Sequence, residues 1–133
     1  MTEANVQQAV PFFAVSDMDA SLHYYVDGLG FKMTNQWTPE GKIRWCWLQL
    51  GGAAIMLQTG KPAPGVSVAF QCRDALALYR EFRSRGIEAK TPFVGNSMWV
   101  VVLTDPDGYK LDFESATNVA EETVYSEATS SLR

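Results

Sequence analysis

An internal repeat constrains the fold of this chain more than any other feature of the sequence. Gly30 and Gly86 each follow a segment with helical spacing of apolar residues, and each is followed by a large apolar residue, Phe31 or Ile87. Glycine commonly ends a helix because it adopts the left-handed conformation at little cost. Strand-like segments come before and after both glycines in the same order. The sequence therefore predicts two copies of one strand–helix–three-strand unit.

The first unit is predicted over residues 6–58. An apolar segment over 10–15 indicates a buried strand, and apolar residues at helical spacing predict a helix over 20–31. Three further strands are predicted over 32–37, 43–50 and 53–58. Gly51 and Gly52 separate the last two strands, a pattern typical of a two-residue hairpin turn.

The second unit is predicted over residues 66–116, after a linker over 59–65 that contains two prolines and two glycines. Its elements are a strand over 66–72, a helix over 74–86, and strands over 87–95, 97–104 and 109–115. The polar tail over 117–133 is compatible with a short helix around 119–128, with disorder, or with packing on a partner. We expect one α+β domain over 1–133.

Composition excludes several classes of function. With 133 residues, a net charge of -4 and a pI of about 4.9, the chain lacks the basic surface that nucleic acids require. No apolar run approaches the roughly 20 residues of a membrane span, and we expect no signal peptide. Cys46 and Cys72 form neither a CxxC pair nor a zinc spacing. They are predicted to be buried free thiols, and the protein to be cytoplasmic.

Two motifs, "VSDMDASLHYYVDGLGF" and "DPDGYKLDF", together with the repeat, resemble the vicinal oxygen chelate superfamily. This superfamily includes glyoxalase I, extradiol dioxygenases, and fosfomycin- and bleomycin-resistance proteins. The resemblance covers roughly residues 8–116. It implies two tandem βαβββ modules whose curved mixed sheets surround a U-shaped cavity. It also implies a homodimer, because that cavity is often completed across a dimer interface.

The resemblance also assigns four positions from which metal-using members take their ligands. In this chain they are Val10, Met56, Ser67 and Asp112. Only Asp112 is a convincing ligand for a divalent cation, because valine has no donor and a methionine thioether suits copper(I). The single histidine, His23, is predicted on the first helix. A slip in this alignment would recruit Gln8, Gln58, Gln71 or Glu114, but we expect no metal and no cofactor.

Strand alternation predicts which residues line the cavity. If Asp112 faces inward, Glu114 does too. A type I turn over 105–108 would then pair the strands so that Trp99 shares their face, whereas a bulge in this hairpin would reverse that assignment. In the first unit, an inward-facing Met56 places Ala54 and Gln58 of its own strand on the same face. The strand across the Gly51-Gly52 turn adds Trp45, Trp47 and Gln49 to that face. The predicted ligand-binding residues are Phe12, Trp45, Trp47, Gln49, Met56, Gln58, Ser67, Gln71, Trp99, Asp112 and Glu114.

An aromatic wall with a few polar groups is typical of a pocket for a flat or cationic organic molecule. The alternative is that the tryptophans close a filled core. Three functions remain open. One is metal-independent sequestration of a small molecule, as in the bleomycin-resistance branch. The second is a glyoxalase-like lyase or dioxygenase, with Asp112 as the only candidate catalytic residue. The third is a domain that binds a metabolite or a protein partner.

Overall fold

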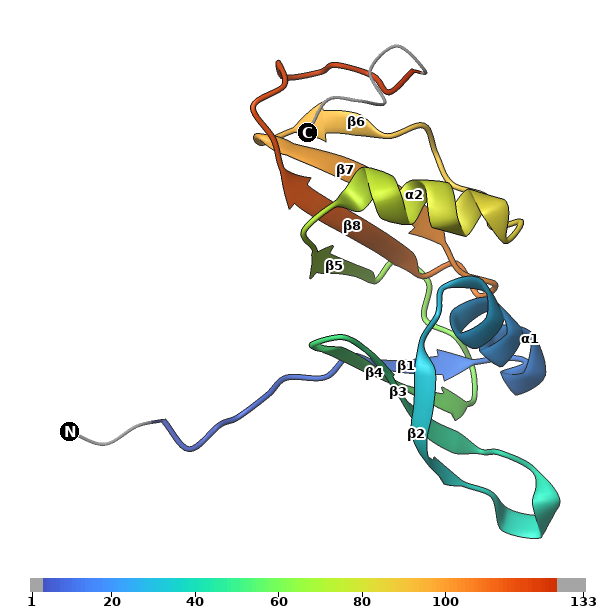
Figure 1. Cartoon of the computed structure of the whole chain (residues 1–133). Coiled ribbons are helices and arrows are strands. Elements are labelled where there is room, and N and C mark those ends of the chain that lie inside the picture. The colour runs from blue at the N-terminus through green and yellow to red at the C-terminus, as the bar shows by residue number, and fades with distance from the viewer. Residues whose placement is uncertain (1–3, 127–133) are drawn as a thin grey trace.

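The first half of the chain forms a four-stranded mixed sheet, with helical segments between its strands (Figure 1). A computed structural model describes residues 4–126. The strands lie in the order β1-β4-β3-β2, with β1 parallel to β4 and the other pairs antiparallel. Their bounds are β1 (Phe12–Val15), β2 (Lys32–Trp37), β3 (Trp45–Leu50) and β4 (Ala53–Thr59). The helical segments are α1 (Met18–Leu22), the π-helix η1 (His23–Gly28) and the 3₁₀ turn η2 (Pro39–Gly41).

The second half repeats this topology. Its sheet has the order β5-β8-β7-β6, and β5 runs parallel to β8. The elements are β5 (Ser67–Gln71), α2 (Ala75–Ser84), β6 (Phe93–Gly95), β7 (Met98–Thr104) and β8 (Lys110–Ala116). The repeat of strand, helix and three strands confirms the predicted α+β class and its two βαβββ modules.

Each helix is preceded by an aspartate cap and followed by one of the two predicted glycines. Asp17 accepts a hydrogen bond from the Ala20 amide at 3.1 Å, and Asp74 accepts one from Ala77 at 3.0 Å. Each carboxylate therefore satisfies one of the amides that the first turn leaves unpaired. Gly30 and Gly86 follow the two helices with φ of +93° and +81°, conformations that favour glycine. The second half of the predicted first helix winds as a π-helix.

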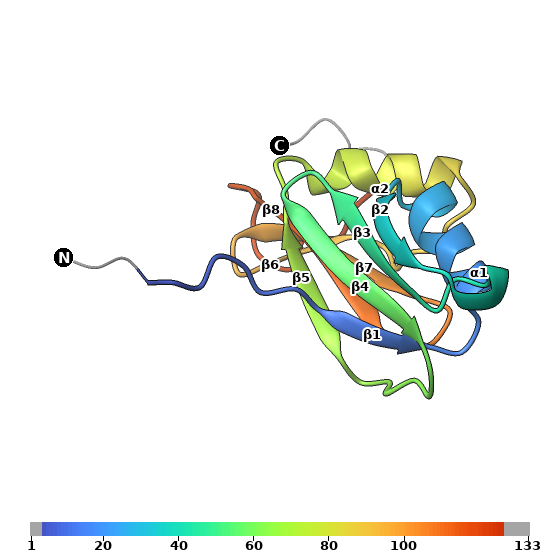
Figure 2. The ribbon, with the colours of Figure 1, turned by 90° about the horizontal axis from the view of Figure 1, so that it is seen from below.

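Both helices lie on one side of the two sheets (Figure 2), so each sheet has a core face and an open face. The buried side chains of both modules belong to one continuous cluster. Tyr109 joins the modules: its ring stacks on Phe13 at 4.2 Å between centroids, and its hydroxyl donates to the Ala14 carbonyl at 2.8 Å. The same hydroxyl accepts a hydrogen bond from the Ala63 amide of the linker at 3.0 Å.

One predicted strand is shorter than expected, and the helical alternative for the tail is excluded over residues 119–126. The strand predicted over 87–95 is confined to β6. Residues 119–126 are not helical and run back along β6. The Val94 amide donates a hydrogen bond to the Thr123 carbonyl, and Phe93 forms an isolated antiparallel β-bridge with Val124. The rest of the predicted tail, 127–133, lies outside the described residues. Within residues 4–126, no helix is long and apolar enough to cross a membrane.

Candidate functional site

The open face of the first sheet gathers large aromatic side chains from all its strands except β4, which contributes Met56. One row across the sheet runs Asn35, Trp47, Met56 and Phe12, because each residue is the register partner of the next. The neighbouring row begins with Trp37 opposite Trp45. We call Phe12, Trp37, Trp45, Trp47 and Met56 the aromatic face.

The aromatic face is uncovered in the single chain. Phe12 is 53% exposed and Trp37 is 59% exposed, and the other three members are half-buried. On the other side of the same strands, Cys46, Leu48, Ile55 and Leu57 are completely buried. Soluble monomers rarely leave clustered apolar side chains exposed without a partner or ligand. The aromatic face is therefore a candidate binding surface.

The polar residues predicted on this sheet also lie on its open face. Gln49 and Gln58 alternate in phase with the aromatic residues, and Gln49 accepts a hydrogen bond from the Trp47 indole at 3.0 Å. This confirms the predicted strand register for the first module. Trp37 was not predicted here. Its place depends on a register shift between Met33 and Asn35 in β2, which apolar alternation alone does not reveal.

The open face of the second sheet carries charged and polar groups. Ser67, Gln71, Asp112 and Glu114 lie on it together, as predicted. The Gln71 amide donates to the Glu114 carboxylate at 2.8 Å. On the same face, the Lys110 ammonium donates to the Thr104 hydroxyl at 2.8 Å. We call Lys110, Asp112 and Glu114 the charged face.

Asp112 has the most perturbed environment on the charged face. Partial burial raises the pKa of its carboxyl, and the neighbouring Glu114 carboxylate raises it further. The ammonium groups of Lys110 and Lys90 oppose the shift. Compared with an isolated aspartate, its surroundings thus shift the Asp112 carboxyl toward the protonated form.

The prediction that Trp99 lines the open face is wrong. Trp99 pairs with Ser115 and points into the core on the side of the sheet where α2 lies. Its side chain is 2% exposed. The residues of β7 that share the face of Asp112 are Met98, Val100, Val102 and Thr104. The cause is the β7–β8 loop, in which Asp105 pairs with Tyr109 and Gly108 has φ +93°. This left-handed glycine adds a bulge residue to the type I turn and shifts the register by one.

The four positions that the resemblance assigns to metal ligands do not form a metal site here. Val10, Met56 and Ser67 supply no imidazole or carboxylate beside Asp112. Within residues 4–126, no three His, Cys, Asp or Glu side chains are grouped to hold a metal ion. His23 pairs with Asp27 at 2.9 Å on the exposed side of η1. The donor set therefore does not fit the divalent cations that use such sites.

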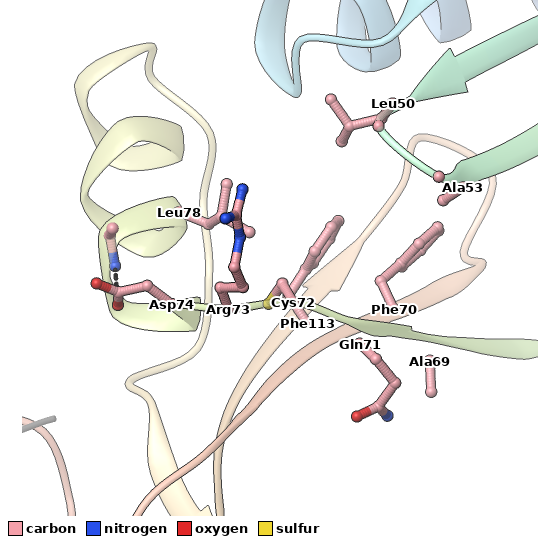
Figure 3. A pocket seen from close by; sticks show the side chains of 13 residues that line it. Leu50, Ala53, Ala69, Phe70, Gln71, Cys72, Arg73, Asp74, Leu78 and Phe113 are labelled. Carbon is pink, nitrogen blue, oxygen red and sulfur yellow. Dashed lines mark hydrogen bonds between the residues drawn. The ribbon is translucent and has the colours of Figure 1, made fainter.

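A separate groove of about 860 Å³ lies between the β3–β4 turn and the start of α2 (Figure 3). Among the residues that line it are Leu50, Ala53, Phe70, Cys72, Leu78 and Phe113. The rings of Phe70 and Phe113, which stack at 4.7 Å between centroids, form its floor. Of the predicted ligand-binding residues, Gln71 lines this groove. The periodicity of apolar residues does not predict this groove, because the groove lies where the two modules meet.

Known families and solved structures include proteins with the same fold as this chain. The family model described as "Glyoxalase/Bleomycin resistance protein/Dioxygenase superfamily" matches residues 7–113. No curated protein sequence matches the chain.

Several solved structures share the fold at low identity. A bleomycin-binding protein complexed with bleomycin is 23% identical, with a TM-score of 0.69 over 83% of this chain and 98% of that one. A bleomycin resistance determinant encoded on transposon Tn5 is also 23% identical, with a TM-score of 0.71 over 84% and 98% of the two chains. An antibiotic-binding protein from Streptomyces sp. CB03234 is 19% identical, with a TM-score of 0.69 over 86% and 100%.

Proposed function

We propose that this chain, which belongs to the glyoxalase/bleomycin resistance protein/dioxygenase superfamily, binds a flat or cationic organic molecule and sequesters it without chemical change. The observation that carries the proposal is the aromatic face, where Phe12 and Trp37 are more than half exposed. Indole and phenyl rings offer stacking and cation–π contacts, each worth about 0.5–2 kcal/mol. Similarity to structures named as bleomycin-binding and antibiotic-binding proteins supports this class of ligand.

The charged face supplies the electrostatic part of the proposed recognition. Asp112 and Glu114 place two carboxylates on one face of the second sheet, and the net charge of the whole chain is -4. Such a charge distribution attracts cations and speeds their encounter with the protein. A cation beside Asp112 would lower the pKa of that carboxyl, so binding and ionisation would favour each other.

The proposed binding unit is a homodimer in which the aromatic face of one copy meets the charged face of the other. Neither face is covered by the chain that carries it, and together they combine the apolar and acidic groups that a cationic aromatic molecule needs. Two enclosed cavities would result, each lined by both copies. Free cysteines at positions 46 and 72 favour a reducing compartment, and we place the protein in the cytoplasm.

A second candidate function rests on Asp112, whose raised pKa suits a general acid or base. A glyoxalase-like or dioxygenase-like enzyme would then use a donor set different from that of metal-using members. Enzymatic turnover would appear as a new product, which sequestration does not generate.

Isothermal titration with bleomycin and with a panel of planar aromatic cations tests the proposal. We expect one ligand per chain and weaker binding of neutral molecules of the same shape. Asp112→Asn should lower affinity for the cations about tenfold while leaving the neutral analogues unchanged. Asp19→Asn, on the exposed surface of α1, changes the net charge equally and should have no such effect. Equal losses for charged and neutral ligands would contradict the role of the charged face.

A further inference from the structure

A row of apolar side chains lies beside the carboxylates on the open face of the second sheet. The row crosses the sheet through successive register partners, which are Gln71, Glu114, Val100, Phe93 and Val124. Register partners in neighbouring strands point to the same side of a sheet, so these side chains share the open face. Polar residues give way to apolar ones between Glu114 and Val100.

The apolar end of this row is exposed in the single chain. Phe93 is 40% exposed and Val124 is 58% exposed, whereas Val100 between Phe93 and Glu114 is 8% exposed. Met98 lies on the same face, two residues before Val100, and is half-buried. We call Phe93, Met98, Val100 and Val124 the apolar strip. An exposed group of apolar side chains bordered by polar ones is typical of a binding surface.

The Phe93 ring is seated against the backbone of β6. A Cβ placed on Gly95 would meet the ring at 3.2 Å. Gly95 comes two residues after Phe93 and therefore lies on the same side of the strand. Since glycine leaves this space open, the ring lies along the strand and forms a preorganised apolar platform.

The C-terminal segment over 117–126 places Val124 at the end of the strip. Backbone hydrogen bonds hold this segment beside β6, among them the 2.8 Å bond from the Tyr125 amide to the Pro92 carbonyl. The Tyr125 ring contacts the buried Trp99 ring, with 6.5 Å between their centroids. Because side chains alternate along an extended segment, a Tyr125 that faces the core directs Val124 to the open face.

The negative charge and the apolar strip are separated by a defined distance. Neighbouring strands lie about 4.8 Å apart, so Phe93 is about 10 Å from Glu114 across the sheet and Val124 about 14 Å. The Lys110 ammonium lies toward the other end of β8, where it donates to the Thr104 hydroxyl. The end of β8 nearest to the strip is therefore its acidic end.

We infer that the ligand is an amphiphilic organic cation, whose charge lies at Asp112 and Glu114 and whose apolar tail lies along the apolar strip. The inference rests on the proposed function, because it names the ligand class of the same open face. Opposite charge favours the cation at one end of the row, and burial of apolar area favours the tail at the other. Phe93 and Val124 then determine the length of tail that the protein accepts.

Isothermal titration with alkyltrimethylammonium ions, whose chains run from ethyl to decyl, tests the inference. Each methylene that reaches the apolar strip should tighten binding about two- to fourfold, because its transfer out of water is favourable. The gain should begin with chains long enough to pass Val100 and end with chains that extend beyond Val124. Ethyltrimethylammonium carries the charge with almost no tail and is the reference ligand.

Substitutions in the row locate the tail and the charge. Phe93→Ala should lower the affinity for the decyl cation about tenfold and that for the ethyl cation much less. Val124→Ala should act only on the longest chains, because Val124 lies one segment farther from Glu114 than Phe93 does. Glu114→Gln should weaken binding by the same factor at every chain length, since it removes attraction to the charge.

Val66→Ala is the control, because Val66 is 44% exposed and lies outside the apolar strip. This substitution should leave the affinities of the whole series unchanged. Urea denaturation checks that each variant folds. Val124 is more than half exposed, so Val124→Ala should fold normally and provides the test if Phe93→Ala is destabilised.

Affinity that does not depend on chain length would overturn the inference, as would a length dependence that Phe93→Ala and Val124→Ala leave intact. An equal loss at every length, with a raised dissociation constant of the dimer in sedimentation equilibrium, would instead assign the strip to contacts between copies. The proposed function stands in these cases, because the ethyl cation still binds. If planar aromatic cations bind and alkyl cations do not, only the inference fails; if neither class binds, both proposals fail.

Discussion

The Tyr25 hydroxyl in the first module donates a 2.7 Å hydrogen bond to the Asp105 carboxylate in the β7–β8 loop of the second. Tyr25 is fully buried and Asp105 is 4% exposed. The other carboxylate oxygen accepts the backbone amides of Asp107 and Tyr109, both at 2.9 Å. One carboxylate therefore shapes the loop that sets the register of β8 and also holds the two modules together.

Removing this hydroxyl should destabilise the fold. Tyr25→Phe leaves the buried Asp105 carboxylate with one donor fewer, and we expect the free energy of unfolding to fall by about 1–3 kcal/mol. The matched control is Tyr24→Phe, because the Tyr24 hydroxyl is buried without a hydrogen-bond partner among the described residues. That substitution should be neutral or slightly stabilising. Urea denaturation of both variants measures the difference, and equal losses would contradict this account.

Asp112 should make stability depend on pH in a defined direction. Burial raises the pKa of this carboxyl in the folded state. The folded protein therefore binds this proton more tightly than the unfolded chain does. The stability this group contributes is present below its unfolded pKa of about 3.9 and is lost as pH rises through its higher folded pKa.

Asp112→Asn removes that dependence. The unfolding free energy of this variant, relative to wild type, should increase as the pH is raised from about 4 to about 7. Denaturation at a series of pH values checks the sign. A constant difference over this range would show that the carboxyl titrates alike in both states.

Trp47 and Trp99 should respond in opposite ways to truncation. Trp47→Ala removes a half-exposed ring from the aromatic face, so we expect about tenfold weaker ligand binding and little loss of stability. Trp99→Ala opens a cavity in the core and should cost about 3–5 kcal/mol. Fluorescence titration and urea denaturation of each variant separate the two effects. Unfolding of the Trp47 variant would assign that ring to the core instead.

Gly108 should tolerate substitution poorly because of its backbone conformation. Its φ is +93°, and an added Cβ would meet the Pro64 Cβ at 3.4 Å. We expect Gly108→Ala to cost about 1–2 kcal/mol. Gly52→Ala is the control, since a Cβ there meets nothing within 4 Å and Gly52 lacks a left-handed φ. Similar unfolding free energies for the two variants would contradict this expectation.

Much of the first module could be predicted from its sequence. Gly51 and Gly52 form a tight hairpin with Leu50 opposite Ala53, so period-two alternation places Trp45, Trp47 and Met56 correctly on one face. In the second module the same alternation fails for Trp99, because a left-handed Gly108 lengthens the loop by one residue. The motif DPDG permits both loops. In this structure the Asp105 carboxylate accepts hydrogen bonds from the Asp107 and Tyr109 amides and from the distant Tyr25 hydroxyl, and these bonds hold the longer loop. The groove was not predictable, since residues far apart in the sequence form its walls.

The length of the β7–β8 loop determines which side chains of β8 face the core and which face the open side of the second sheet. Side chains alternate along a strand, so one residue more or less in the loop would exchange the two faces of β8 relative to β7. Its effect would equal the simultaneous replacement of all seven residues of β8, with Leu111 and Phe113 turned outward and Asp112 turned into the core. Relatives that differ by a single loop residue can thus keep nearly the same sequence and yet present a different chemical surface.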